Sequence, residues 1–568
     1  MEFSYWIKTI IFMLAGIGCL LVGFELLSTN ITKLSHKGLK KLFNKTQNND
    51  IVGVGIGTAT TAIMQSSAAT TVMVVGFVNT GLMTLKQATA IIMGANIGTT
   101  ITAQLAALSS FDFGSYAIGL AGVGVFIKMF AKKDKILTLG NALAGFGLLF
   151  LGLKVIGLSI NSEFDGVCLV KESIGNLLSS INGWYAPIVL FFLGIILTAL
   201  VQSSALITTI IITLTSAGIY IGAGVGATTL TNNVLYLILG TNIGTCITAL
   251  LSSVGATTSA KRASMIHLLF NTAGAVVFIL IFIFIPHFME LTFVKWFDQP
   301  ATQVAMFHTF FNVVCTFIFL PISKIFVKLA TLFIKDESSS SNKVKLTYVD
   351  DRLLKTPSIA IHMIRRELSL MYAKSVETLG TALDGFFNRD IDKKETIDKD
   401  NEYLENISKL IIEYMVKLTN ENLAFEDECT MSNFYKIIND ILRIGEIGDN
   451  IGKYTRQMVT EDLSFSENVI LQIGFMRSQI KALYEMTEET FISKNLKLLS
   501  EVDQLEDKVD IMRKELIDDH FDRLNKGLCK PQNSSVFVNL VNNLERAADH
   551  MTYIAYSVKD AYDQANKQ

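Results

Sequence analysis

The sequence Thr61-Ala62-x-x-Gln65-Ser66-Ser67-Ala68 occurs a second time as Thr198-Ala199-x-x-Gln202-Ser203-Ser204-Ala205. Each copy lies in a stretch that is apolar but rich in Gly, Ser and Thr. A Gln side chain in such surroundings is costly unless its polar atoms find partners. The duplicated pattern therefore indicates a polar site built from two related halves.

Two further segments repeat in the same order along the chain. Leu14-Ala15-Gly16-Ile17-Gly18 matches Leu143-Ala144-Gly145-Phe146-Gly147. Gly94-Ala95-Asn96-Ile97-Gly98-Thr99-Thr100 matches Gly240-Thr241-Asn242-Ile243-Gly244-Thr245-Cys246. Three matches in one order indicate an internal duplication, with repeats at about 1–130 and 136–334.

Composition separates the chain into two kinds of domain. Half of the 568 residues are hydrophobic and the mean hydropathy is +0.42, which excludes a disordered chain and a coiled coil. The formal charge is +9 over residues 1–335 and −11 over residues 336–568. The six cysteines have no paired spacing, so neither a disulfide framework nor a zinc site is expected. The first part reads as a membrane domain and the second as an acidic soluble domain.

Apolar stretches long enough to cross a bilayer mark the expected membrane spans. We expect seven, at about 5–28, 87–108, 113–130, 136–159, 226–251, 263–286 and 303–334. The two Gln-Ser-Ser stretches, 51–82 and 186–218, are different, because each could form one long helix or a re-entrant hairpin of two short helices.

Loop charge favours hairpins, because cytoplasmic loops carry excess Lys and Arg. The lysines of 30–50 (Lys33, Lys37, Lys40, Lys41, Lys45) and of 131–135 place both loops inside. An even number of crossings must lie between two loops on the same side, and the spans 87–108 and 113–130 supply two. The stretch 51–82 therefore does not cross. The acidic loop 160–185 should lie outside and Lys261-Arg262 inside. The span 226–251 supplies the one crossing needed between them, so 186–218 enters and leaves from outside. We therefore expect seven crossings, an external N-terminus, a cytoplasmic C-terminal domain and two inverted repeats, an arrangement typical of secondary transporters.

A hairpin that turns inside a bilayer exposes backbone groups, which are tolerated only where they line a hydrated cavity. The helix that leaves each turn points its positive N-terminal end at the same place. Two such ends would form a site for a small anion. Backbone, Ser, Thr and Asn oxygens suit Na⁺, and binding of each ion would raise the affinity for the other. The fold class expected is thus an all-α, polytopic membrane protein with two re-entrant hairpins and a separate helical domain.

The candidate binding residues are the polar members of the repeated segments. Asn96 and Asn242 could instead join two helices, and close packing of small residues is the general alternative. His267-x-x-Phe270-Asn271 and His308-x-x-Phe311-Asn312 form another pair, for which we expect helix–helix bonding, with ligand contact as the alternative. The full candidate set is Thr61, Gln65, Ser66, Ser67, Asn96, Thr99, Thr100, Thr198, Gln202, Ser203, Ser204, Asn242 and Thr245.

At these residues the sequence resembles the type II sodium–phosphate cotransporter family, over about 1–335. The resemblance implies sodium-driven movement of inorganic phosphate, with Gln65-Ser66-Ser67 and Gln202-Ser203-Ser204 lining the phosphate and sodium sites. The fourth motif position is Ala68 and Ala205 here, where animal members often have Ser. That difference leaves the number of coupled sodium ions open.

The rest of the chain comprises a linker at 336–349 and a helical domain of about six helices at 350–568. This domain resembles PhoU, a duplicated three-helix bundle associated with phosphate regulation, through Leu544-Glu545-Arg546-Ala547-Ala548-Asp549-His550. The matching first-half segment keeps Asp449 but has Gly445 in place of an acidic residue. The resemblance implies that a divalent metal could bind Glu545, Asp549 and Asp449, with solvated helix faces as the alternative.

These observations predict a multi-pass protein of the bacterial inner membrane that carries phosphate with Na⁺ and has a PhoU-like regulatory domain. A phosphate exporter and a phosphate sensor are the alternatives. We expect no enzyme, because no nucleophile–base pair, phosphate-binding loop or metal triad occurs in the membrane half. The expected partners are phosphate, sodium and the lipid bilayer, with a homodimer left open and no nucleic acid.

Overall fold

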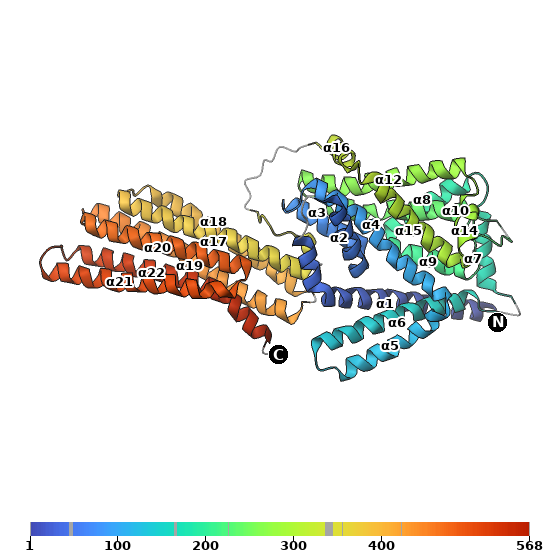
Figure 1. Ribbon diagram of the computed structural model, residues 1–568, viewed down its shortest axis with the longest axis horizontal. Coiled ribbons are helices and arrows are strands. Elements are labelled where there is room, and N and C mark those ends of the chain that lie inside the picture. The colour runs from blue at the N-terminus through green and yellow to red at the C-terminus, as the bar shows by residue number, and fades with distance from the viewer. Residues whose placement is uncertain are drawn as a thin grey trace. The chain divides into compact units, whose positions relative to one another are not determined.

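The computed structural model describes residues 2–44, 49–163, 167–224, 226–335, 345–354, 356–421 and 423–566, which are mainly helical (Figure 1). The chain divides into two compact units, Met1–Ser338 and Ser339–Gln568. The first coincides with the expected membrane domain and the second with the expected helical domain. Each is described by itself below.

The first unit is built from sixteen α-helices among the residues described. Their bounds are α1 (Glu2–Asn44), α2 (Asp50–Met64), α3 (Ser67–Asn79), α4 (Leu85–Ala107), α5 (Asp112–Phe130), α6 (Asp134–Ile160), α7 (Leu169–Ser180), α8 (Ala186–Val201), α9 (Ser204–Ser216), α10 (Asn232–Gly244), α11 (Cys246–Ser252), α12 (Thr258–Phe284), α13 (Phe288–Leu291), α14 (Phe293–Trp296), α15 (Pro300–Phe319) and α16 (Ser323–Phe333), with a 3₁₀ turn η1 (Leu108–Ser110).

Seven segments of the described chain are long and apolar enough to cross a membrane, as expected. They are Ser4–Ser35, Leu85–Ser110, Asp112–Phe130, Asp134–Ile160, Asn232–Ser252, Thr258–Phe284 and Pro300–Phe319. The two Gln-Ser-Ser stretches form pairs of shorter apolar helices, α2–α3 and α8–α9. Neither stretch is one continuous helix.

Glycines at equivalent repeat positions let two pairs of helices approach closely. A Cβ on Gly94 of α4 would lie 2.0 Å from the Val54 carbonyl oxygen of α2, and a Cβ on Gly240 of α10 would lie 2.1 Å from the Phe191 carbonyl oxygen of α8. No real Cβ occupies such a distance, so each crossing depends on Gly. The repeated segments thus pack in the same way in both copies.

Three element boundaries differ from expectation. Residues 30–44, expected in a loop, continue α1 to Asn44, because Lys and Leu are good helix formers and no Pro interrupts them. The expected span 303–334 is divided into α15 and α16 near Pro321, which cannot donate a helical hydrogen bond. The expected loop 160–185 contains α7. Lys45, Asp165 and the Ser-rich part of the linker lie outside the described residues.

The second unit consists of six α-helices in the described residues, as predicted. They are α17 (Pro357–Asn388), α18 (Lys393–Thr419), α19 (Phe425–Thr460), α20 (Glu467–Ser493), α21 (Leu499–Asn525) and α22 (Asn533–Asn566), with 3₁₀ turns η2 (Asp351–Leu353) and η3 (Leu496–Leu498). Helices α17, α18 and α19 pack together, α20, α21 and α22 pack together, and α19 joins the two groups through α22. The unit is therefore two three-helix groups.

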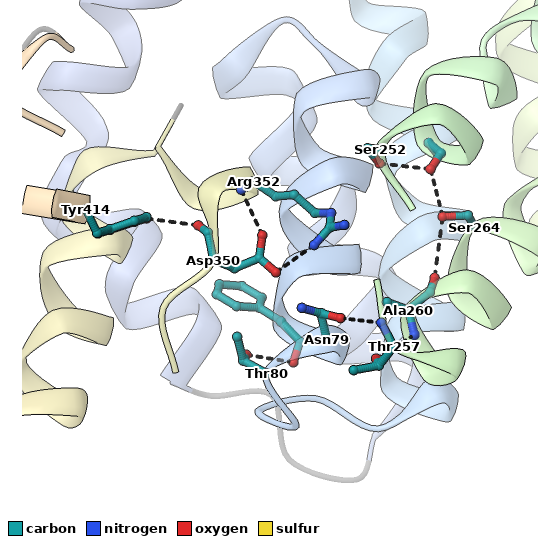
Figure 2. A network of polar contacts seen from close by, with 11 residues as sticks. Asn79, Thr80, Ser252, Thr257, Ala260, Ser264, Asp350, Arg352 and Tyr414 are labelled. Atoms are coloured by element: carbon teal, nitrogen blue, oxygen red, sulfur yellow. Dashed lines mark hydrogen bonds and ion pairs between the residues drawn. The ribbon is translucent and has the colours of Figure 1, made fainter. Parts of the chain in front are cut away.

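Short polar contacts fix chain turns inside each unit (Figure 2). In the first unit the Asn79 side chain at the end of α3 accepts a 2.8 Å hydrogen bond from the Thr257 backbone N–H, which ties α3 to the start of α12. In the second unit the Asp350 carboxylate accepts from the Arg352 guanidinium at 2.7 Å, while Tyr414 donates to the Asp350 carbonyl oxygen at 2.9 Å.

Candidate functional site

The first Gln-Ser-Ser segment is a sharp turn between α2 and α3. Gln65 has a left-handed backbone, with φ of +51°, and ends α2. Ser66 then caps α3, because its hydroxyl accepts a hydrogen bond from the Ala69 N–H at 3.1 Å. The left-handed residue followed by a helix cap is what breaks the apolar segment into two helices.

The second segment repeats this turn between α8 and α9. Gln202 has φ of +58° and ends α8, and the Ser203 hydroxyl accepts from the Leu206 N–H at 3.2 Å. Left-handed backbone is uncommon for a residue other than Gly, and such strain is frequent at functional positions. Two strained Gln residues at equivalent positions therefore agree with the polar site expected from the duplication.

The hydroxyls that flank each turn are buried. In the first copy, Thr61 donates to the Thr70 hydroxyl at 3.0 Å, and Thr70 in turn donates to the Ser66 carbonyl oxygen at 3.1 Å. In the second copy, the equivalent Thr198 hydroxyl is fully buried and has no protein partner among the residues described. Ser67 and Ser204, the first residues of α3 and α9, are also buried.

The two glutamines differ in how they are held. Thr102 of α4 donates a 2.9 Å hydrogen bond to Gln65 Oε1, and Gln65 Nε2 donates to the Ala62 carbonyl oxygen at 2.6 Å. Gln202 is exposed, and the buried hydroxyl of Thr248, which matches Thr102 in the repeat, has no hydrogen-bond partner within the described chain. Among the described residues, a side-chain hydrogen bond therefore joins Gln65 to α4, and none joins Gln202 to Thr248 of α11.

Each repeated Asn is paired with a buried His. Asn96 Oδ1 lies 3.4 Å from His267 Nε2, and Asn242 Oδ1 lies 3.4 Å from His308 Nε2. An amide oxygen only accepts, so this arrangement forms a hydrogen bond when the imidazole carries its hydrogen on Nε2. Both His-x-x-Phe-Asn segments thus make the contacts between helices that were expected, while ion binding by Asn96 and Asn242 stays a prediction.

Helices α12 and α15 each connect the two copies. His267 of α12 bonds Asn96 of α4, while Asn271, one turn along α12, donates to Cys246 Sγ of α11 at 3.3 Å. On α15, His308 bonds Asn242 of α10, whereas Thr309 accepts a 2.7 Å hydrogen bond from Gln104 of α4. Each of the two helices therefore forms hydrogen bonds with repeated segments of both copies.

The remaining candidates are placed on the same helices but not all in one cluster. Thr99 and Thr100 donate to the carbonyl oxygens of Ala95 and Ile97 within α4, at 3.0 and 2.7 Å. Thr245 is the residue between α10 and α11, whereas its counterpart Thr99 lies inside the unbroken α4. No hydrogen bond links the two Gln turns in the described residues.

Thr102 and Thr248 were missed from the sequence although a signal was present. The repeated Gly-x-Asn-Ile-Gly-Thr segment continues as Ile101-Thr102-Ala103 and Ile247-Thr248-Ala249. Extending the match by three residues would have added both. Ser28 of α1, which donates to the Met64 carbonyl oxygen beside the first turn at 2.5 Å, had no signal because it lies outside every repeated segment.

The carboxylates proposed for a divalent metal do not form a site. Asp449 is paired with Lys394 at 2.8 Å and Lys453 at 2.7 Å, which lowers its pKa, and Glu545 is paired with Arg513 at 3.3 Å. No group of three or more His, Cys, Asp or Glu side chains in the described residues could hold a metal. Because the oxygens of Asp449 and Glu545 already bind cationic side chains, these residues do not fit a metal cluster.

Helices α21 and α22 share an acidic face instead. Burial, and after it the neighbouring carboxylates, raises the pKa of Glu506, Glu545 and Asp549.

Helices α19 and α22 are joined where Asp440 and His550 lie 2.9 Å apart. Asn543 of α22 also donates a 3.0 Å hydrogen bond to the Tyr454 hydroxyl of α19, so the two helices meet through these two polar contacts.

The fold and this polar core define a polytopic, all-helical integral membrane protein with a separate helical bundle. The family model for the Na+/Pi-cotransporter matches residues 19–157, and the model for the PhoU domain matches residues 368–455 and 473–558. The chain belongs to the Na+/Pi-cotransporter family and carries a PhoU domain.

Relatives support both parts of this assignment. "Putative inorganic phosphate export protein YjbB" of Escherichia coli strain K12 is 23% identical over 564 residues, 98% of each chain. YqeW of Bacillus subtilis strain 168 is 30% identical over 327 residues, 57% of this chain and 96% of that protein. Human "Sodium-dependent phosphate transport protein 2B" is 37% identical over 105 residues, 16% of this chain and 15% of that protein. No solved structure matches the chain.

Proposed function

We propose that this protein carries inorganic phosphate across the bacterial cytoplasmic membrane together with Na⁺, by alternating access, under the influence of its PhoU domain. The observation that carries the proposal is the matched pair of strained turns at Gln65 and Gln202, each followed by a Ser-capped helix start. A relative named as a sodium-dependent phosphate transport protein supports phosphate and sodium as the cargo.

In the proposed mechanism the two turns hold the ions. The free N–H groups at the starts of α3 and α9 give each helix end a partial positive charge, which favours a phosphate oxyanion. Hydroxyls of Ser66, Ser67, Ser203 and Ser204 would donate to phosphate, and their lone pairs, with the oxygens of Thr61, Thr99, Thr100, Thr198 and Thr245, would coordinate Na⁺. Cation and anion bound side by side stabilise each other, which couples their transport.

The proposed membrane arrangement follows from the loop charges. The helix pairs α2–α3 and α8–α9 would enter and leave the bilayer on one side, from the cytoplasm and from outside respectively, in two inverted repeats. The seven long apolar helices would cross, with the N-terminus outside and the PhoU domain in the cytoplasm. Rocking of one repeat against the other would then expose the turns alternately.

Export is the second candidate for direction. It is favoured by the match to YjbB, which extends over 98% of each chain and therefore includes both domains. A symporter moves its cargo in whichever direction the summed gradients favour, so import and export differ in regulation rather than in the binding chemistry. The PhoU domain is the part of this chain that we expect to set that regulation.

Flux of radiolabelled phosphate into proteoliposomes that contain the full chain tests the function. An inward Na⁺ gradient should accelerate uptake, and replacing Na⁺ with K⁺ should abolish the acceleration. The Gln65→Ala and Gln202→Ala variants should lose most of the flux, whereas Gln87→Ala, at the capping box of α4, should retain it. Flux that ignores the Na⁺ gradient would contradict symport, and full flux in both Gln variants would contradict the site.

A further inference from the structure

A cavity of about 190 Å³ lies at the end of α9 that is far from the second turn. Its walls come from η1, the first turns of α5, the last turns of α6 and the end of α9. The η1 wall and the α9 wall are joined by a hydrogen bond between the Ser110 and Ser216 hydroxyls, which lie 2.7 Å apart. We call it the Lys154 cavity, defined by the polar lining residues Ser110, Ser115, Lys154, Asn161, Thr213 and Ser216.

The lining of the Lys154 cavity is positively charged. Lys154 is its one charged residue, it has no Asp or Glu, and Lys154 forms no ion pair with the described residues. A second cavity of about 420 Å³, beside α7, contains both Lys171 and Glu172 and is therefore balanced in charge. The Lys154 cavity alone of these two attracts an anion by its own charge.

Several hydrogen-bond donors in the cavity are free to bind an anion. Thr213 and Asn161 donate to the carbonyl oxygens of Thr209 and Gly157, but the Asn161 amide keeps a second N–H. The Ser110–Ser216 contact uses one hydroxyl hydrogen and leaves the other, and the Ser115 hydroxyl has no partner within the described residues. With the three N–H groups of Lys154, these donors suit a tetrahedral oxyanion.

The cavity is connected to the second Gln-Ser-Ser turn by α9. Ser204, at the turn, begins this helix, and Ser216, in the cavity wall, ends it. At 1.5 Å per residue the two serines are separated by about 18 Å along the axis. An ion held in the cavity would therefore lie at the opposite end of the helix from the turn.

We propose that the Lys154 cavity is an entry site that binds phosphate before it reaches the Gln202 turn. The proposal deepens the proposed function and rests on it. Lys154 supplies the attraction, and the hydroxyls and the Asn161 amide supply directional hydrogen bonds without a competing carboxylate. A site of this kind raises the local phosphate concentration on one face of the carrier and changes the KM measured from that face.

The test measures the KM for phosphate in proteoliposomes that contain the full chain, with phosphate added on the cavity's side. That side is identified by mass spectrometry after labelling with a membrane-impermeant thiol reagent, because Cys168 Sγ lies 3.6 Å from the carbonyl oxygen of Asn161. Removal of one charge close to the anion should raise the KM at least about fivefold in Lys154→Met. The kcat should stay unchanged.

Two variants separate the cavity from general charge effects. Lys154→Arg keeps the charge, so its KM should stay within about twofold of the wild-type KM. Lys171→Met removes a positive charge from the second cavity, and its KM should also stay within about twofold of the wild-type KM. An unchanged KM in Lys154→Met overturns the proposal, as does an equal rise in Lys171→Met. An unchanged KM with activity that follows the anionic lipid content would assign the cavity to a lipid headgroup and also overturn it.

Failure of the underlying function gives a different result. If the wild type carries no phosphate, the proposed function falls and the entry site falls with it. If the wild type carries phosphate with the Na⁺ dependence expected but Lys154→Met has an unchanged KM, only the entry site is refuted.

Discussion

The hydroxyl of Thr102 donates a 2.9 Å hydrogen bond to Gln65 Oε1, and the described residues of the second repeat contain no equivalent contact. There Thr248 occupies the matching position with its hydroxyl buried and unpartnered in the described chain, and Gln202 is exposed. The bond orients the Gln65 amide and joins the first turn to α4. The corresponding parts of the second repeat are present but separate, so equal substitutions in the two copies should have unequal effects.

Thr102→Val should lower kcat/KM for phosphate about tenfold, because it leaves the Gln65 amide oxygen without its partner. The matched Thr248→Val should change kcat/KM less than twofold, since an isosteric methyl replaces a hydroxyl that makes no bond. Initial rates of labelled phosphate uptake in proteoliposomes measure both. Equal losses in the two variants would show that the Gln65–Thr102 bond has no special role.

The glycine crossings should tolerate no side chain. Gly94→Ala places a Cβ 2.0 Å from the Val54 carbonyl oxygen, and Gly240→Ala places one 2.1 Å from that of Phe191. Because backbone cannot yield cheaply, each substitution should lower the melting temperature of the purified protein by several degrees or prevent its folding. Gly55→Ala is the matched control, since a Cβ there meets nothing within 4 Å. A normal melting temperature for Gly94→Ala would contradict the close crossing.

The Asn96–His267 pair should act as a unit. In a double-mutant cycle with Asn96→Ala and His267→Ala, unfolding of the full chain should reveal a coupling energy of about 1 kcal/mol. The equivalent cycle of Asn242 and His308 should give a similar value, because both pairs have the same 3.4 Å separation and the same burial. Strictly additive losses in both cycles would mean that these residues stabilise the core independently.

The acidic face of α21 and α22 should make the PhoU domain less stable as pH rises. Burial, then repulsion by Asp510, Asp549, Asp507 and Asp503, raises the pKa of Glu506. A carboxyl whose folded pKa is raised favours the fold when protonated, and that stability is lost as pH rises through the raised value. Glu506→Gln should therefore slow hydrogen exchange in α21 at pH 7.

The same substitution should leave exchange unchanged at pH 4, after correction for the intrinsic rate, where Glu506 is already protonated. High salt should reduce the difference at pH 7, because the repulsion is partly exposed and screened. Glu501→Gln, near the start of the same helix, controls for removal of a surface carboxylate. Faster exchange in Glu506→Gln at pH 7 would mean that the ionised carboxylate stabilises the helix.

Much of the architecture could be predicted because hydropathy and repetition are local signals. The seven apolar segments are readable from residue types alone, whereas the interruption of both Gln-Ser-Ser stretches was predicted only with the charges of the loops. The end of α1 was not predicted, because Lys residues are common both in cytoplasmic loops and in helices. The division between α15 and α16 could have been anticipated from Pro321, which lies within an otherwise apolar run.

The sequence identified the polar residues of the candidate site, but it did not indicate which of them contact each other. The sequence singled out Asn96 and His267 separately, but which Asn meets which His depends on how α12 and α15 cross α4 and α10. The expected metal ligands also have partners that the sequence alone did not indicate. Asp449 and Glu545 have the right chemistry, but Lys394, Lys453 and Arg513 come from neighbouring turns or helices and occupy the carboxylates.

Thr245 separates α10 from α11, whereas the matching Thr99 lies inside the unbroken α4, so the two duplicated halves differ in structure. For a carrier that uses both turns, unequal halves give unequal rates for loading and release at the two membrane faces. They cannot change the final accumulation ratio, which the ion gradients alone determine. Such a carrier is kinetically one-sided while remaining thermodynamically reversible, so its preferred direction in a cell can follow from timing as well as from driving force.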